Sequence, residues 1–209
     1  FSHDKLRDVA YTELSPMQRR RLHRRVAQAL ETIYATDLDP ISGQLAAHYE
    51  QAGVVPSAIT YYQRAGVVAQ RIYANVEAIS LYQKGLALLA TLPDRAQHEL
   101  SLQTALVVPL ATNAGYGATA LMDACHRVRV LAHQLGETPD PAVLRALAIG
   151  SIGRLQFGQA QELGTQLLAL AERDQDQILF TEASYVLGVT AFFAGEFGRA
   201  RCHLEQAVA

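Results

Sequence analysis

Several residue types that mark other kinds of protein are scarce or absent in this sequence. Trp does not occur among its 209 residues, aromatic residues make up 7%, and there are only two cysteines, Cys125 and Cys202. Without a CxxC pair or an even cysteine framework, the composition excludes a disulfide-built scaffold. We expect both cysteines to be reduced, buried helix residues of a cytoplasmic protein.

Long apolar runs are also missing. The longest, Ala105–Ala111, contains a proline and is far shorter than the roughly 20 residues that cross a bilayer. We therefore predict no transmembrane helix and no membrane partner. The chain begins with Phe1 and ends inside an uncapped helical pattern, so we expect it to be an excerpt of a longer protein.

Charge of one sign is concentrated in one place only. The net charge is −2, yet residues 1–35 carry seven Lys or Arg against four Asp or Glu, which leaves an acidic excess in the rest. A protein that wraps nucleic acid needs a broad cationic surface to displace counterions from the phosphates. Nucleic acid is therefore not the partner we expect.

What the sequence does contain is apolar residues at helical spacing almost throughout, with no sustained alternation of period two. The fold class is therefore predicted to be all-α. A break or kink is expected at Pro109, which lacks a backbone donor. Turn residues divide the chain into helices expected at 4–14, 16–35, 41–52, 56–72, 75–91, 95–113, 117–135, 140–156, 158–173, 176–194 and 196–209.

The helices contain an internal repeat. Large, small and aromatic residues recur at Leu45, Ala46, Tyr49, Gly53, Ala58, Tyr62 and Ala65, and a similar set recurs at Leu187, Gly188, Gly195, Ala200, Leu204 and Ala207. This spacing resembles the tetratricopeptide repeat, in which small residues lie where two helices cross. We predict a right-handed α-solenoid of irregular tetratricopeptide-like hairpins.

The repeat spacing is irregular in two ways. Ala120, Ala160 and Ala200 are 40 residues apart, which is longer than the standard repeat and keeps HEAT-like repeats as an alternative. Ala58 and Ala78 are only 20 residues apart, so the helix at 56–72 is predicted to serve both as the second helix of one hairpin and as the first of the next.

Residues 1–36 do not fit the repeat. Their pattern resembles the junction that follows the ATPase in bacterial STAND regulators (signal-transducing ATPases with numerous domains), through residues Phe1, His3, Arg7, Asp8, Ala10, Tyr11, Leu14, Arg20, Arg21, His23, Val26, Ala27, Leu30 and Glu31. The resemblance implies that 1–36 is the end of a winged-helix or linker element. It further implies that 37–209 is a repeat array joined in the parent protein to a nucleotide cyclase, protein kinase or transcription-activator domain.

Catalysis is not expected within this chain. No G-x-x-x-x-G-K-[ST] loop, H-E-x-x-H helix or G-x-S-x-G turn occurs, so we expect no enzyme activity, no cofactor and no metal here. The seven histidines are scattered. The resemblance instead implies a non-catalytic sensor that binds a protein, peptide or inducer and couples it to an effector domain.

Two surfaces are candidates for that partner. The first is a groove on the first helices of the hairpins, where an Arg beside aromatics fits a peptide or carboxylate; its residues are Thr112, Asn113, Arg145, Glu182, Tyr185 and Phe193. The second is a basic contact made by Arg19, Arg20, Arg21, Arg24 and Arg25, which suits an acidic protein or the ATPase domain of its own chain. Solvated faces remain the alternative at both surfaces.

Five tyrosines lie in the first part of the repeat array. Tyr49, Tyr62 and Tyr82 fall on packing positions of the repeat, so we predict that they fill the core, whereas Tyr61 and Tyr73 are unassigned.

Two further functions stay open as alternatives. The chain could also be a structural clamp or oligomerisation arm with no ligand of its own, or the sensor arm of a transcription regulator.

Overall fold

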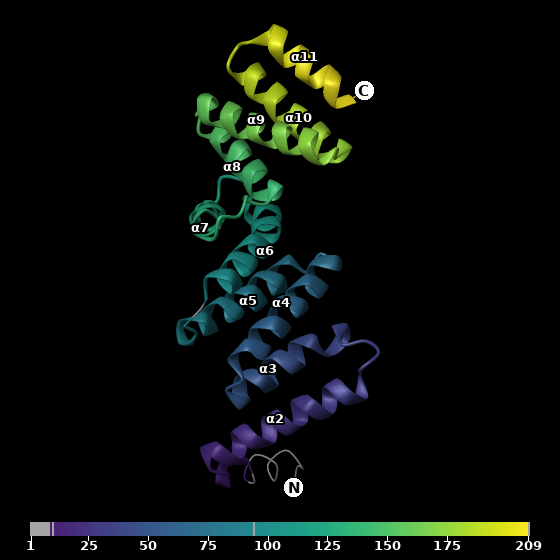
Figure 1. The fold of residues 1–209 in the computed structure, drawn as a ribbon, viewed down its shortest axis with the longest axis vertical. Coiled ribbons are helices and arrows are strands. Elements are labelled where there is room, and N and C mark those ends of the chain that lie inside the picture. The colour runs from purple at the N-terminus through teal and green to yellow at the C-terminus, as the bar shows by residue number, and fades with distance from the viewer. Residues whose placement is uncertain (1–8, 10, 94, 209) are drawn as a thin grey trace. The chain divides into compact units, whose positions relative to one another are not determined.

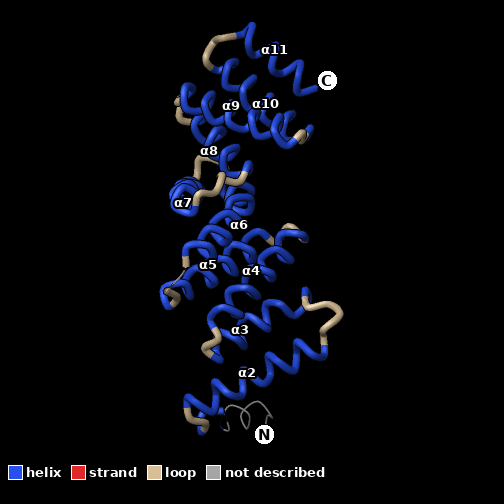
Figure 2. Tube along the Cα trace, viewed as in Figure 1, coloured by secondary structure: helices blue, strands red, loops and turns tan. Residues whose placement is uncertain are grey.

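The protein is all-α. The computed structural model describes residues 9, 11–93 and 95–208, and in these residues only helices and the turns between them occur (Figure 2). Most of the expected helix at 4–14 lies outside the described residues. The chain divides into two compact units, residues 1–98 and 99–209. The predicted domain boundary at residue 36 is therefore not a boundary between the compact units.

The first unit consists of helices that pack in chain order. They are α2 (Pro16–Ile33), the short η1 (Asp39–Ile41), α3 (Ser42–Ala52), α4 (Val55–Arg71), α5 (Asn75–Leu88) and the short η2 (Leu89–Thr91) (Figure 1). Each long helix contacts the next one, and α4 contacts both α3 and α5, as the 20-residue spacing predicts. The start of α2 is fixed by a capping box, in which the Ser15 hydroxyl accepts from the Gln18 backbone.

The first unit repeats one contact at this 20-residue spacing. The hydroxyl of Tyr62 on α4 donates to the Glu50 carboxylate on α3, and the hydroxyl of Tyr82 on α5 donates to Gln70 on α4. Both rings are buried. A Cβ at Gly66 would lie 2.3 Å from Tyr82 Cε1, so α5 reaches its position only because residue 66 has no side chain.

Core filling by the three tyrosines is confirmed, since Tyr49, Tyr62 and Tyr82 are all buried. Tyr61 stacks on Tyr49 with ring centroids 5.6 Å apart, and both hydroxyls donate to Glu31 of α2. Burial, followed by the hydrogen bond to Glu31, raises the pKa of Tyr61 to about 12. These contacts tie α2 to α3 and α4.

In the second unit each helix from α7 onward packs against the next one in the chain. It comprises α6 (Ala96–Ala114), whose first three residues belong to the first unit, then α7 (Thr119–Leu135), α8 (Pro141–Gly153), α9 (Phe157–Asp174), α10 (Gln177–Phe193) and α11 (Phe197–Val208) (Figure 1). Arg127 of α7 holds Glu99 of α6 through two hydrogen bonds of 2.6 and 2.8 Å. Helices α8 and α10 are in direct contact with each other and with α9.

One close helix crossing in the second unit lies at Gly188, as the repeat pattern predicts. A Cβ at Gly188 would be 2.6 Å from Leu204 Cγ, and Ala200 is buried. One expectation fails, since Cys202 is exposed rather than buried. Helix α6 passes through Pro109 without a break, and a kink at that residue stays a prediction. A right-handed solenoid along the whole chain stays a prediction.

Candidate functional site

Helices α8 and α10 differ from their neighbours in being apolar on nearly all sides. Each has a single charged residue, Arg145 on α8 and Glu182 on α10, and the Arg145 guanidinium donates to the Glu182 carboxylate. Helix α9, which packs against both, is amphipathic. A helix that is apolar all round requires cover on every face. Part of the apolar surface of α8 and α10 lacks such cover among the described residues.

This uncovered surface forms a groove of about 730 Å³. We call it the α8–α10 groove. Its lining consists of Tyr116 from the turn after α6, Ile149, Ile152 and Gly153 from α8, Leu155 from the following turn, and Tyr185, Val186, Val189 and Phe193 from α10. A volume of this size, with an apolar and aromatic lining, is typical of a ligand pocket.

The wall at Tyr116 depends on two glycines. Gly115 has φ +80°, a left-handed conformation that favours glycine and turns the chain after α6. At Gly150 a Cβ would lie 2.9 Å from the Tyr116 carbonyl oxygen and 3.0 Å from Met122 Sδ. The turn that carries Tyr116 therefore lies directly on α8, which fixes one side of the groove.

Leu155 forms part of the rim and has an unusual backbone. Its φ is +59°, and its side chain is 74% exposed. For a residue with a Cβ, the left-handed helical conformation costs roughly 1–2 kcal/mol. Gly115 and Gly195, which lie 40 residues before and after it, adopt the same left-handed conformation without that cost.

The groove also exposes aromatic surface with polar ends. Tyr185 and Phe193 are 54% and 58% exposed. No described residue forms a hydrogen bond with the hydroxyl of Tyr116 or Tyr185. An aromatic side chain offers a large apolar contact area, and the tyrosine hydroxyl adds a donor and an acceptor.

The predicted groove residues are only partly brought together. Tyr185 and Phe193 line the groove, whereas Arg145 and Glu182 lie beside it and neutralise each other. Thr112 and Arg145 line a separate hollow of about 40 Å³, and the Thr112 hydroxyl donates to its own helix at Val108. Asn113 is exposed and lines neither space.

The sequence analysis missed Tyr116, Ile149, Ile152 and Leu155. A signal for Leu155 was present, because the 40-residue register places it where the neighbouring repeats have glycine. The two isoleucines looked like ordinary core residues, since their exposure depends on how the next hairpin packs.

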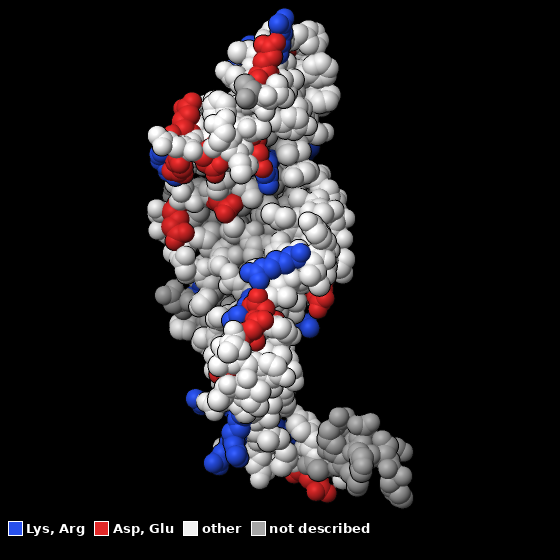
Figure 3. All heavy atoms as spheres, turned by 90° about the vertical axis from the view of Figure 1, so that its right-hand side faces the viewer, with Lys and Arg blue, Asp and Glu red and all other residues white. Residues whose placement is uncertain are grey.

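The five arginines of α2 form no ion pair with another described residue. Arg19 donates to the Thr12 carbonyl at 2.7 Å and lies 4.9 Å from the centroid of the Tyr11 ring, while Arg20, Arg21, Arg24 and Arg25 are exposed. On the face shown in Figure 3, the charged side chains of the described residues gather in small groups, some of mixed sign and others of one sign only. A basic contact at α2 stays a prediction.

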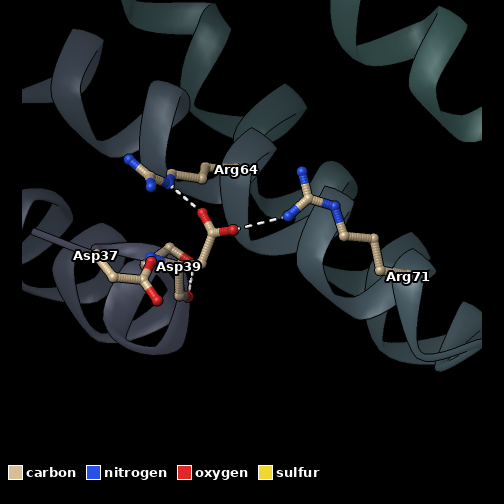
Figure 4. Close-up of polar contacts among 5 residues, drawn as sticks. Asp37, Asp39, Arg64 and Arg71 are labelled. Atoms are coloured by element: carbon tan, nitrogen blue, oxygen red, sulfur yellow. Dashed lines mark hydrogen bonds and ion pairs between the residues drawn. The ribbon is translucent and has the colours of Figure 1, made fainter.

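Two polar clusters in the first unit have structural explanations. Asp39 in η1 accepts from Arg64 Nε at 2.6 Å and from Arg71 Nη1 at 2.8 Å, which ties η1 to α4 (Figure 4). The hydrogen bond from Arg64 is the main reason why the pKa of Asp39 lies below its usual value. Both arginines are therefore occupied by this carboxylate.

The second cluster joins α2 to α3. His23 Nδ1 and His48 Nδ1 are 2.8 Å apart, and the Tyr11 hydroxyl lies 2.9 Å from His23 Nε2. Burial, and then the charge of His23, lower the pKa of His48. Within the described part of the chain, no three His, Cys, Asp or Glu side chains are arranged to hold a metal ion. Nor is any described helix long and apolar enough to cross a membrane.

Neither a protein-family model nor a curated protein matches this chain. Among solved structures, the chain is similar to BtubC (BKLC) from P. vanneervenii, with a TM-score of 0.64 and 12% sequence identity. The match covers 94% of this chain and 91% of the other. At that identity the likeness shows a shared all-helical fold.

Proposed function

We propose that this chain is a non-catalytic binding module that captures a protein, peptide or inducer in the α8–α10 groove. The observation that carries this proposal is the apolar surface of α8 and α10, which is left uncovered although both helices are apolar on nearly all sides. Exposed apolar patches on a soluble domain mark interaction sites. Tyr185 and Phe193 supply the rigid aromatic surface on which binding energy concentrates.

The resemblance to STAND regulators supports a place for this module in a multidomain signalling ATPase. The groove connects the turn after α6, through Tyr116, with α8 and α10. A ligand bound there contacts all three segments, so it favours the arrangement in which they are held together. Such a change in population is what a sensor passes to an attached effector domain.

A structural clamp or an oligomerisation arm is the second candidate function. It is favoured by the same uncovered surface, because another domain of the parent protein or a second copy of the chain would also cover it. The two candidates differ in what must be added: a sensor binds a separate ligand, whereas an oligomerisation arm associates with itself as its concentration rises.

Substitution in the groove separates these cases. A partner is first isolated by pull-down with the tagged chain and identified, and its affinity is then measured for the wild type and for the double variant Tyr185→Ser with Phe193→Ser. The control is Ile178→Ser, since Ile178 is 76% exposed on the same helix but lies outside the groove.

We expect the double variant to weaken binding by at least about tenfold, because it removes the aromatic contacts, and the control to leave binding unchanged. Equal affinity for all three proteins would overturn the proposal. Self-association of the wild type that is lost in the double variant would instead support the oligomerisation arm.

A further inference from the structure

Resting on the proposed function, we infer that the ligand of the α8–α10 groove is a small uncharged molecule with a largely apolar, ring-containing body, and that Leu155 is a specificity-determining contact for it. This inference deepens the proposal by choosing one chemical class. It rests on three properties of the groove: its uncharged lining, its rim residue and its size.

The lining of the groove favours an uncharged ligand. None of the residues that line it is charged, Arg145 and Glu182 are paired with each other, and Arg154, between the lining residues Gly153 and Leu155, donates to Met122 Sδ. An ionic ligand would lose its hydration against an apolar lining, and to pair with Arg145 it would have to displace Glu182. The expectation that Arg145 reads a carboxylate therefore does not fit the pairing, and a neutral ligand does.

Leu155 closes α8 with a left-handed turn, in which the Gln156 backbone donates to the Ser151 carbonyl at 2.9 Å. It combines a left-handed backbone with a large, mostly exposed apolar side chain, and the equivalent positions of the adjacent repeats, Gly115 and Gly195, have the residue that this backbone favours. Strained residues are retained where the surrounding structure uses them. Here the side chain lies at the rim of an apolar groove, where a bound apolar ligand would cover it.

Gln175 provides a matched comparison. It also has a left-handed backbone, with φ +52°, at the end of α9. Its side chain is polar and exposed and does not line the groove. Tyr73 in the first unit has the same φ of +59° and is 87% exposed, so this backbone ends helices elsewhere in the chain as well. What distinguishes Leu155 is that its apolar side chain lines the groove.

The size of the groove favours a small molecule over a long peptide. The turn that carries Tyr116 forms one wall and Leu155 forms part of the rim, and the volume of about 730 Å³ is that of a pocket for a small ligand. The hydroxyls of Tyr116 and Tyr185 supply hydrogen bonds for one or two polar atoms of such a ligand. A ring-containing body fits the aromatic surface of Tyr185 and Phe193.

A pair of fluorescent probes tests this inference on the full 209-residue chain. N-phenyl-1-naphthylamine is uncharged, and 1-anilinonaphthalene-8-sulfonate has the same ring system with an added sulfonate. Both are titrated into the wild type and into Leu155→Gly, Leu155→Ala and Gln175→Gly, and the melting temperature of each variant is measured in parallel. Leu155→Ala keeps a Cβ at the strained position, so it separates loss of the side chain from a change in the turn.

We expect the uncharged probe to bind the wild type at a single site and the sulfonate to bind at least about tenfold more weakly. Both Leu155 variants should weaken binding of the uncharged probe by about tenfold, because they remove apolar contact area, and Gln175→Gly should bind as the wild type does. Leu155→Gly and Gln175→Gly should both raise the melting temperature, since each removes left-handed strain.

Equal binding of the two probes, or unchanged binding of the uncharged probe in both Leu155 variants, would overturn the inference. So would the absence of saturable probe binding. If the uncharged probe fails to bind while the Tyr185→Ser and Phe193→Ser double variant still loses a protein partner, the groove binds a macromolecule. In that outcome the inference fails and the proposed function stands.

Discussion

Arg145 and Glu182, the only charged residues of α8 and α10, form an ion pair with each other. The pair joins two helices that are otherwise held by apolar contacts, and it leaves the adjacent groove uncharged. Sequence separation hides this relationship, because the partners are 37 residues apart. With both charges paired, neither is free to bind a ligand of the groove.

A double-mutant cycle tests the pair. Arg145→Met and Glu182→Met should each lower the free energy of unfolding, because each leaves one charge without its partner. The combined variant should recover part of the loss, with a coupling of about 0.5–1 kcal/mol, since both side chains are only partly buried. Urea unfolding of the four proteins measures it. Strictly additive effects would show that the pair contributes nothing to stability.

The contact between Gly66 and Tyr82 yields a second prediction. Gly66→Ala should destabilise the protein by about 1–3 kcal/mol, because the new Cβ would overlap the buried Tyr82 ring. Gly43→Ala is the control, since its Cβ would meet Ala65 at an ordinary 3.9 Å. Thermal unfolding of both variants is the measurement, and equal melting temperatures would mean that α5 does not lie this close to α4 in solution.

The histidine pair between α2 and α3 predicts a pH dependence. Because the folded protein lowers the pKa of His48 below its ordinary value of 6.5, the unfolded chain binds the proton more readily. The contribution to stability is present above pH 6.5 and is lost as the pH falls below it. Urea unfolding of the wild type and of His48→Gln between pH 7.5 and 5.5 tests this. The same decline in both proteins would place the pH dependence elsewhere.

Absence of a phosphate-binding loop predicts that the chain does not bind ATP. No G-x-x-x-x-G-K-[ST] motif occurs in the sequence, so there is no loop of backbone amides to hold the phosphates. A calorimetric titration with Mg-ATP should give only the heat of dilution. Saturable binding in the micromolar range would contradict the proposal that this chain is a non-catalytic module.

Most of the fold could be predicted from sequence because helical periodicity and turn residues are local signals. The 20-residue spacing of Ala58 and Ala78 anticipated that α4 packs on both of its neighbours, and Gly188 was placed correctly at a close crossing. At Pro109 the alternative of a break was wrong, because α6 continues through this buried residue, whereas the alternative of a kink stays a prediction.

The candidate site was harder to predict than the fold. Tyr185 and Phe193 were identified because aromatics on a first helix exceed what packing needs. Leu155 was missed because nothing local marks a leucine as left-handed, and Tyr116 was missed because its position depends on the contact of its carbonyl with Gly150. Both depend on how separate hairpins meet.

Photo-crosslinking in cells tests the central claim, that the α8–α10 groove is a binding site, most directly. With p-benzoylphenylalanine in place of Tyr185, irradiation of the protein should give a defined adduct with the ligand or partner, and the same substitution at Ile178, which lies outside the groove on the same helix, should not. An adduct that forms from Ile178 but not from Tyr185 would contradict the account.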